Sequence, residues 1–143
     1  MKNIRIAAGI IRNTAGDIFI TQRAADGHMA GKSEFPGGKI ETGETPEQAL
    51  VRELQEEVGI TATRYELFQT LEHTFDDRHI AFWFFMVEDW EGTPWGKEGQ
   101  AGRWVAQAAL DSDAFPPANA PVIARLLASA GQEKGRLLAA ILR

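Results

Sequence analysis

Residues 38–60 read GKIETGETPEQALVRELQEEVGI, and this stretch carries both the start and the stop signal of a helix. Thr45 is suited to the N-cap and Pro46 to the first helical position. Gly59 is suited to the position just past the last turn. These signals predict a helix over about residues 46–58.

The predicted helix places acidic side chains on its apolar side. At about 100° per residue, one arc collects the apolar residues Ala49, Leu50, Leu54 and Val58. Glu57 falls inside this arc, and Glu53 lies between two of its members. Glu56 lies at the edge of the arc and Arg52 on the opposite side. Spacings of three and four residues therefore put the three glutamates on one flank.

Carboxylates that face a core are unusual, because desolvation and mutual repulsion both oppose their ionisation. A solvated surface would explain a Glu-rich helix, but it would place the glutamates on the other side. A divalent cation resolves the conflict, and ligation by carboxylates alone favours Mg²⁺, or else Mn²⁺, over zinc or copper. Because Mg²⁺ commonly takes phosphate oxygens as further ligands, the pattern indicates a phosphate-containing substrate.

The segments around the helix are mainly typical of strands. Residues 3–12 and 17–22 are rich in Ile and flank a turn-prone stretch, which predicts a β-hairpin. Residues 80–88 are almost all apolar, which predicts a strand covered on both faces in the middle of a sheet. Further predictions are a polar loop at 23–36, strands at 65–75 and 103–106, a loop at 91–102 and a second helix that begins near Asn119.

The composition predicts one domain in a reducing compartment. The chain has 143 residues, of which 44% are hydrophobic and 24% charged. A net charge of −5 argues against a surface for nucleic acid polymers. The N-terminal stretch is interpreted as a strand rather than a secretion signal, and no run of about 18 apolar residues predicts a membrane span. The absence of cysteine excludes thiolate chemistry and favours the cytoplasm.

We divide the chain into a domain over residues 1–130 and a C-terminal tail over residues 131–143. The tail has apolar residues at helical spacing, namely Leu137, Leu138, Ile141 and Leu142. Packing of this tail on the body is favoured over docking on another subunit or fraying. Its role is unknown, and we expect a monomer.

Residues 38–60 match the Nudix box, Gly-x5-Glu-x7-Arg-Glu-U-x-Glu-Glu-x-Gly-U, where U is a bulky aliphatic residue. The matched positions are Gly38, Glu44, Arg52, Glu53, Leu54, Glu56, Glu57, Gly59 and Ile60. Other stretches resemble the MutT subfamily, among them MKNIRIAAGIIRN, TQRAADGHMAGKSEFPGGKIETGETPEQA, DRHI, EGTPWGKEGQ and DAFPPANAPVIA. The resemblance covers about residues 1–128. It implies an α+β fold with a mixed β-sheet sandwiched between helices.

The resemblance also implies hydrolysis of a nucleoside triphosphate to the monophosphate and pyrophosphate. The favoured substrate is 8-oxo-dGTP, and its removal would prevent mutation during DNA replication, a form of DNA repair in the nucleotide pool. The implied metal ligands are the Gly37 carbonyl, Glu53, Glu56, Glu57 and Glu98. The general base is either Glu53 or Glu98. Arg52 would orient a glutamate of the box, and Glu44 completes the implied catalytic set.

The implied nucleotide-binding residues lie mostly outside the box. They are Arg23, His28, Glu34, Phe35, Pro36, Gly37, Lys39, Arg78 and Asn119, with Arg23 or Lys39 on the phosphates. If Asn119 faces the purine, its amide can distinguish the two bases, because 8-oxoguanine carries a proton on N7 where guanine has an acceptor. An amide offers one acceptor beside one donor, which matches that edge. Asn119 is equally suited to a helix N-cap, Phe35 to core packing and Arg23 to a surface ion pair.

Two rival functions stay open on the sequence. One is a Nudix pyrophosphohydrolase acting on other (d)NTPs or nucleoside diphosphate derivatives, which the box alone does not exclude. The other is a nucleotide sensor without catalysis, which the intact glutamate set disfavours.

Overall fold

The structure is a computed structural model that describes residues 1–24 and 30–141. Its strands are β1 (Lys2–Ile11), β2 (Asp17–Gln22), β3 (Ser33–Glu34), β4 (Gly37–Lys39), β5 (Thr61–Thr74), β6 (Arg78–Glu91) and β7 (Gly102–Ala106). Its α-helices are α1 (Pro46–Val58) and α2 (Ala120–Ile141), and short 3-10 helices are η1 (Gln107–Ala109), η2 (Ser112–Ala114) and η3 (Pro117–Asn119).

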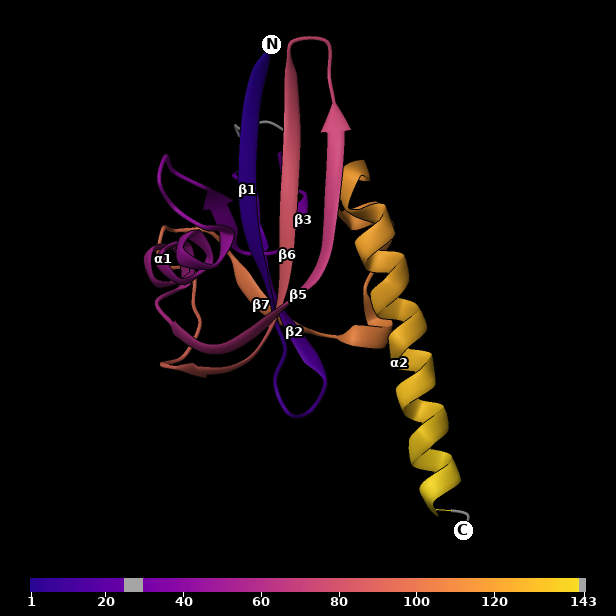
Figure 1. The fold of residues 1–143 in the computed structure, drawn as a ribbon. Helices are drawn as coiled ribbons and strands as arrows, with labels where there is room; N and C mark the ends of the chain where they lie inside the picture. The colour runs from indigo at the N-terminus through magenta and orange to yellow at the C-terminus, as the bar shows by residue number, and fades with distance from the viewer. Residues whose placement is uncertain (25–29, 142–143) are drawn as a thin grey trace.

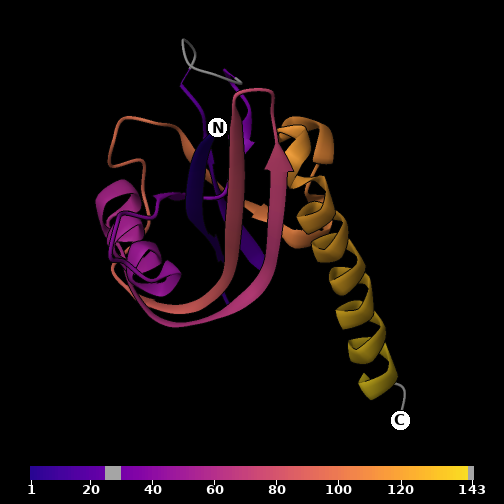
Figure 2. The ribbon, with the colours of Figure 1, turned by 45° about the horizontal axis from the view of Figure 1, so that its top comes forward.

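The described strands form two sheets (Figure 1). The larger one has four strands in the order β4-β1-β6-β5, and the smaller one has three in the order β3-β2-β7. β1 and β6 are parallel, whereas the other pairs are antiparallel. The sheet is therefore mixed, and α1 and α2 lie on opposite sides of it (Figure 2). The expected α+β architecture, a mixed sheet between helices, is confirmed.

β6 runs through the interior of the larger sheet and supplies both cores. Phe84 and Met86 belong to the cluster that α2 covers with Val122, Ile123 and Leu126. Phe85 and Val87 belong to the cluster that α1 covers with Leu50 and Leu54. Because successive side chains of a strand point to opposite faces, an unbroken apolar run fits a strand buried on both faces. The predicted strand at residues 80–88 and its place inside the sheet are confirmed, but it is buried on both faces only over residues 84–87, because Ile80 and Phe82 line a cleft.

α1 has the bounds that its capping signals predict. The Thr45 hydroxyl accepts a hydrogen bond of 3.1 Å from the Gln48 backbone N–H, and the Gln48 side chain accepts one of 2.9 Å from the Thr45 N–H. Gly59 ends the helix with a φ of 71°, a left-handed conformation that disfavours residues with a Cβ. The strong local signals at both ends explain why this element is predictable from sequence.

The predicted hairpin of residues 3–12 and 17–22 is wrong beyond its turn. Asn13 closes the turn, since its side chain accepts a 2.9 Å hydrogen bond from the Asp17 N–H. One bridge, Arg12 to Ile18, follows, and the strands then separate. β1 pairs with β4 and β6, while β2 pairs with β3 and β7. Both strands bury residues on both faces, so each needs neighbours that its local sequence does not specify.

α2 passes through the predicted boundary between residues 130 and 131. Its last turns extend away from the sheets (Figures 1 and 2). The helical spacing of the tail is thus matched by a helical backbone as far as Ile141, and Leu142 lies outside the described residues. The role of the tail and the division into domain and tail stay predictions. Within the described ranges, neither helix has the length and apolar character to cross a lipid bilayer.

Candidate active site

Two glycines of β4 allow the backbone to lie against both β1 and α1. A Cβ built on Gly38 would lie 2.3 Å from the carboxyl carbon of Glu53, and one on Gly37 would lie 2.1 Å from the Ala7 carbonyl oxygen. The backbone of β1 therefore leaves no room for a side chain at Gly37, whereas a side chain at Gly38 would displace the Glu53 carboxylate. The Gly37 N–H donates a 2.8 Å hydrogen bond to Oε2 of Glu57. β4 therefore holds its backbone directly beside the carboxylates of α1.

Glu57 is buried among apolar residues, as its position on the helix predicts. Its side chain is 7% exposed. Burial raises its pKa to about 8, against the hydrogen bond from Gly37, and the neighbouring carboxylates Glu34, Glu98 and Glu53 raise it further. This carboxylate has no ion-pair partner among the described residues, and a cation beside it would restore its ionised form.

Arg52 pairs with Glu53 and Glu56, the other two glutamates of the acidic flank. Its Nη1 donates to Glu53 at 2.8 Å and to Glu56 at 3.3 Å, so the side chain reaches back from the side opposite the apolar arc. Glu53 is partly buried, which raises its pKa, although the hydrogen bond from Arg52 opposes that shift. The Glu56 side chain is 57% exposed. Of the three glutamates, Glu57 alone is fully on the buried side.

Arg52 also holds the loop that precedes α1. Its Nε and Nη2 donate to the two carboxylate oxygens of Glu44 at 2.8 and 2.9 Å, and Nη2 donates to the Lys39 carbonyl at 3.0 Å. The hydrogen bonds from Arg52 lower the pKa of Glu44 to about 2, with help from the Glu41 N–H. The two bonds from Arg52 to Glu44 form a bidentate pair, a geometry that a guanidinium provides and an ammonium group does not.

Glu98 lies in the loop between β6 and β7, and its side chain is exposed. Two backbone hydrogen bonds dock this loop on the end of α1, from Trp95 N–H to the Val58 carbonyl and from Lys97 N–H to the Glu57 carbonyl, each 3.2 Å long. The loop is therefore anchored to the last turn of α1. This brings Glu98 close enough to raise the pKa of Glu57.

No group of three or more His, Cys, Asp or Glu side chains in residues 1–24 and 30–141 is arranged to hold a metal ion. Two of the carboxylates, those of Glu53 and Glu56, pair with Arg52 instead. The donor chemistry nevertheless fits a hard divalent cation, because the neighbouring donors are carboxylate oxygens and the Glu57 carboxylate is buried with its pKa raised.

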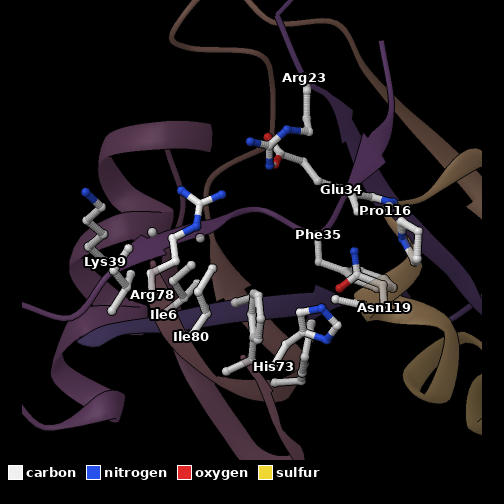
Figure 3. A pocket seen from close by; sticks show the side chains of 18 of the residues that line it. Ile6, Arg23, Glu34, Phe35, Lys39, His73, Arg78, Ile80, Pro116 and Asn119 are labelled. Carbon is white, nitrogen blue, oxygen red and sulfur yellow. The ribbon is translucent and has the colours of Figure 1, made fainter. Parts of the chain in front are cut away.

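A cleft of about 450 Å³ lies beside β4 (Figure 3). Seven of the predicted nucleotide-binding residues line it: Arg23, Glu34, Phe35, Gly37, Lys39, Arg78 and Asn119. Pro36 is not among the lining residues, because it lies buried beside β1 with its carbonyl accepting a 2.7 Å hydrogen bond from the Gly9 N–H. His28 lies outside the described residues. Gly37 lines the cleft and also contacts Glu57, so the cleft and the acidic face of α1 meet at β4.

The apolar lining of the cleft was missed by the sequence reasoning. It comprises Ile4, Ile6 and Ala8 of β1, Ile80, Phe82 and Phe84 of β6, and Phe75, Pro116 and Pro117. The strand residues alternate along the chain and pair in register, as Ile4 with Ile80 and Ile6 with Phe82. A period of two in both strands was a signal for this shared face. His73 of β5 also lines the cleft.

Asn119 lies at one end of the cleft and its amide points inward (Figure 3). The residue is 9% exposed, and η3 holds its backbone through a 3.0 Å hydrogen bond from its N–H to the Pro116 carbonyl. Among the described residues the amide has no hydrogen-bond partner, so a capping role for α2 has no bond to support it. A buried amide in this position is free to bind a ligand.

The walls of the cleft combine charges with aromatic rings. Phe35 stacks on Phe115 with ring centroids 5.1 Å apart, so it both packs in the core and faces the cleft. Arg23 pairs with Glu34 at 3.0 Å, which opposes the rise that burial causes in the Glu34 pKa. The Arg78 guanidinium lies 5.0 Å from the centre of the Phe75 ring. Lys39 and Arg78 lie at the end away from Asn119 (Figure 3).

Comparison with known proteins gives concordant matches. A family model described as NUDIX domain matches residues 7–125. A protein of Escherichia coli K12 named 8-oxo-dGTP diphosphatase is 67% identical over 88% of this chain and 98% of its own length. Another E. coli K12 protein, named CTP pyrophosphohydrolase, is 38% identical over 90% of this chain and 94% of its own. A solved structure from work on MutT of Aliivibrio salmonicida and Vibrio cholerae has a TM-score of 0.74 and 46% identity, with 87% of this chain and 96% of that chain covered.

Proposed function

The chain belongs to the NUDIX domain family, and we propose that it hydrolyses 8-oxo-dGTP to 8-oxo-dGMP and pyrophosphate. The relative with 67% identity carries that name and is covered over nearly its whole length. The observation that carries the proposal is the Asn119 amide, which has no partner among the described residues and lies at one end of a cleft. The same cleft is lined by Gly37, whose N–H donates to the Glu57 carboxylate. One end suits a purine base, and the other suits a charged triphosphate.

The Asn119 amide would select the oxidised base. In the required orientation its oxygen accepts from N7–H of 8-oxoguanine and its nitrogen donates to O6. With dGTP the same oxygen would face the lone pair of N7, and both acceptors would stay buried without a donor. Sites that recognise a polar group by hydrogen bonds discriminate more strongly than apolar pockets do. Phe35 and the apolar lining from β1 and β6 would pack against the base.

The phosphates would lie toward β4 and α1. Lys39 or Arg23, both at the cleft, would contact phosphate oxygens. Mg²⁺ or Mn²⁺ would be held by Glu53, Glu56, Glu57, Glu98 and the Gly37 carbonyl. When bound there, it supplies charge neutralisation on the phosphate oxygens. Arg52 bonds to one oxygen of Glu53 and one of Glu56, which leaves the second oxygen of each carboxylate for the metal, while Glu44 anchors Arg52.

The reaction would transfer a pyrophosphoryl group to water. The water oxygen attacks the β-phosphorus, the bond from that phosphorus to the oxygen bridging the α-phosphate breaks, and 8-oxo-dGMP leaves with the bridging oxygen. A general base, either Glu53 or Glu98, takes the proton of the attacking water. Hydrolysis in ¹⁸O-labelled water should therefore place the label in pyrophosphate, and label in the nucleotide would contradict attack at the β-phosphorus.

The decisive experiment compares kcat/KM for 8-oxo-dGTP, dGTP and CTP in the presence of Mg²⁺. A preference of about 100-fold or more for 8-oxo-dGTP over dGTP is expected if the amide discriminates as argued. Comparable values for the two guanine nucleotides would overturn the proposal. A preference for CTP would favour the alternative of a pyrophosphohydrolase for another nucleotide, which the 38% identical relative represents. Tight binding without pyrophosphate release would favour a sensor.

The proposed activity implies a role in keeping an oxidised nucleotide out of newly made DNA, and so in preventing mutation. The partner is then a small nucleotide rather than a nucleic acid polymer or a membrane. A monomeric state and a cytoplasmic location stay predictions.

A further inference from the structure

Gln100 connects the loop that carries Glu98 to the end of α1. Its Oε1 accepts a 2.9 Å hydrogen bond from the Glu98 N–H, and its Nε2 donates a 3.1 Å hydrogen bond to the Glu57 carbonyl. The side chain is partly buried. A single amide thus contacts the backbones of two residues whose carboxylates belong to the proposed site.

The rest of the loop depends on backbone contacts and not on Gln100. The Trp95 and Lys97 N–H groups bond to the Val58 and Glu57 carbonyls, which lie in the last turn of α1 and lack partners within the helix. Gly99 turns the chain with a φ of 89°. Its N–H donates to the Gly96 carbonyl at 3.0 Å. Residues 95–97 are therefore anchored directly, whereas the link from the Glu98 amide to α1 passes through the Gln100 side chain.

We infer that Gln100 is a positioning residue, whose amide fixes Glu98 relative to Glu57 so that both carboxylates face the same phosphates. The inference rests on the proposed function, because it assigns Glu98 a part in the hydrolysis. An amide is suited to the task, since it offers an acceptor to the Glu98 N–H and a donor to the Glu57 carbonyl. Methionine has nearly the same length and lacks both groups. Glutamate keeps the acceptor and places a negative charge against a carbonyl.

The inference is tested with Gln100→Met. We expect kcat for 8-oxo-dGTP to fall about tenfold, which corresponds to the loss of geometry at one catalytic group. KM should change less than twofold, because Gln100 is not among the lining residues of the cleft. The matched control is Lys97→Met, which removes the 3.3 Å bond from Nζ to the Gln55 carbonyl on the same loop without touching Glu98. That control should keep the wild-type kcat.

A double-mutant cycle separates positioning from a general effect on the fold. If Gln100 acts through Glu98, adding Gln100→Met to Glu98→Gln should cause little further loss of kcat. Equal, multiplicative losses in both backgrounds would overturn the inference. If Glu98→Gln alone has full activity, the role proposed for Glu98 fails, and the inference fails with it.

Amide hydrogen exchange gives a readout that needs neither metal nor activity. In the metal-free protein, Gln100→Met should speed exchange of the Glu98 amide by about tenfold or more, while the amides of Trp95 and Lys97 keep their protection. Gln100→Glu should restore slow exchange at Glu98, because it keeps the acceptor. Unchanged exchange at Glu98 in Gln100→Met would overturn the inference even if the enzyme hydrolyses 8-oxo-dGTP. Conversely, a chain with no hydrolase activity and the expected exchange pattern would overturn only the proposed function.

Discussion

The backbone N–H of Gly37 donates to the buried carboxylate of Glu57 at 2.8 Å. This bond joins β4, which lines the cleft, to α1, which carries the acidic residues of the site. Any ligand that fills the cleft beside Gly37 therefore lies next to the least solvated carboxylate of the helix. Four predictions follow from this arrangement and its neighbours.

Glu57→Gln should abolish most of the hydrolysis and leave the fold intact. A neutral amide fits the buried position and keeps an oxygen for the Gly37 N–H, but it is a poor ligand for a hard cation. We expect kcat to fall by about 100-fold or more, as for loss of a metal ligand. Kinetics and thermal unfolding measure the two effects. Glu91→Gln, at an exposed position of β6, serves as the control. Full activity in Glu57→Gln would show that this carboxylate has no part in the site.

The metal-free protein should lose stability as the pH rises from about 5 to 8. Burial raises the pKa of Glu57 to about 8, so over this range the unfolded chain has released its proton and the folded chain still binds it. Each step upward in pH therefore favours unfolding, until the folded pKa is passed. Denaturant unfolding with a chelator present, at pH 5.5, 7 and 8.5 as suggested settings close to these values, measures the slope. Glu57→Gln should reduce the slope of the free energy of unfolding against pH. An equal slope in the wild type and the variant would show that other titratable groups cause the pH dependence.

Asn119→Ala should remove the preference for the oxidised base. We expect kcat/KM for 8-oxo-dGTP to fall about tenfold or more, while the value for dGTP changes little because dGTP gains nothing from the amide. The ratio of the two values is the measurement. Asn3→Ala, at an exposed position of β1, is the control for the substitution itself. An unchanged ratio in Asn119→Ala would place base recognition elsewhere in the cleft.

Arg52→Lys should lower kcat although it conserves the charge. Arginine uses Nε, Nη1 and Nη2 on Glu44, Glu53 and the Lys39 carbonyl, whereas an ammonium cannot reproduce the paired bonds to Glu44. We expect a loss of about tenfold in kcat. Arg64→Lys, which alters an exposed pair with Asp89, should have no such effect. If the kcat of Arg52→Lys equals that of the wild type, the positive charge of Arg52 is sufficient and the paired hydrogen bonds of its guanidinium have no role in catalysis.

Local signals explain what could be predicted of the fold. α1 has its cap, its proline and its terminal glycine within one short stretch, so its bounds needed no tertiary information. The same periodicity correctly placed Glu57 on the buried side. The pairing of β1 and β2 was wrong because adjacency in sequence suggested a hairpin, whereas strands buried on both faces pair with distant partners.

The site divides in the same way. The residues of α1 were found from one helix, but Arg23, Arg78 and Asn119 come from separate elements, and only the family resemblance brought them together. The role of Gln100 could not be predicted from the sequence. Its side chain bonds to Glu98, two positions away, and to Glu57, 43 positions away. No periodicity or motif in the sequence indicates that one side chain connects these two residues. The sequence placed Arg52 on the side of α1 opposite the apolar arc. Its hydrogen bond to Glu53 depends on the path of its long side chain and became apparent only in the structure.

The parallel pairing of β1 with β6 has a consequence for the synthesis of the protein. β1 is synthesised first, yet its partner β6 is synthesised only after α1 and β5. Contacts between such distant segments slow folding, since a long loop must close before they form. Until then the Ile-rich strands at the N-terminus stay uncovered on the nascent chain, where they invite aggregation or chaperone binding. The order of emergence from the ribosome should therefore influence how much native protein a cell obtains.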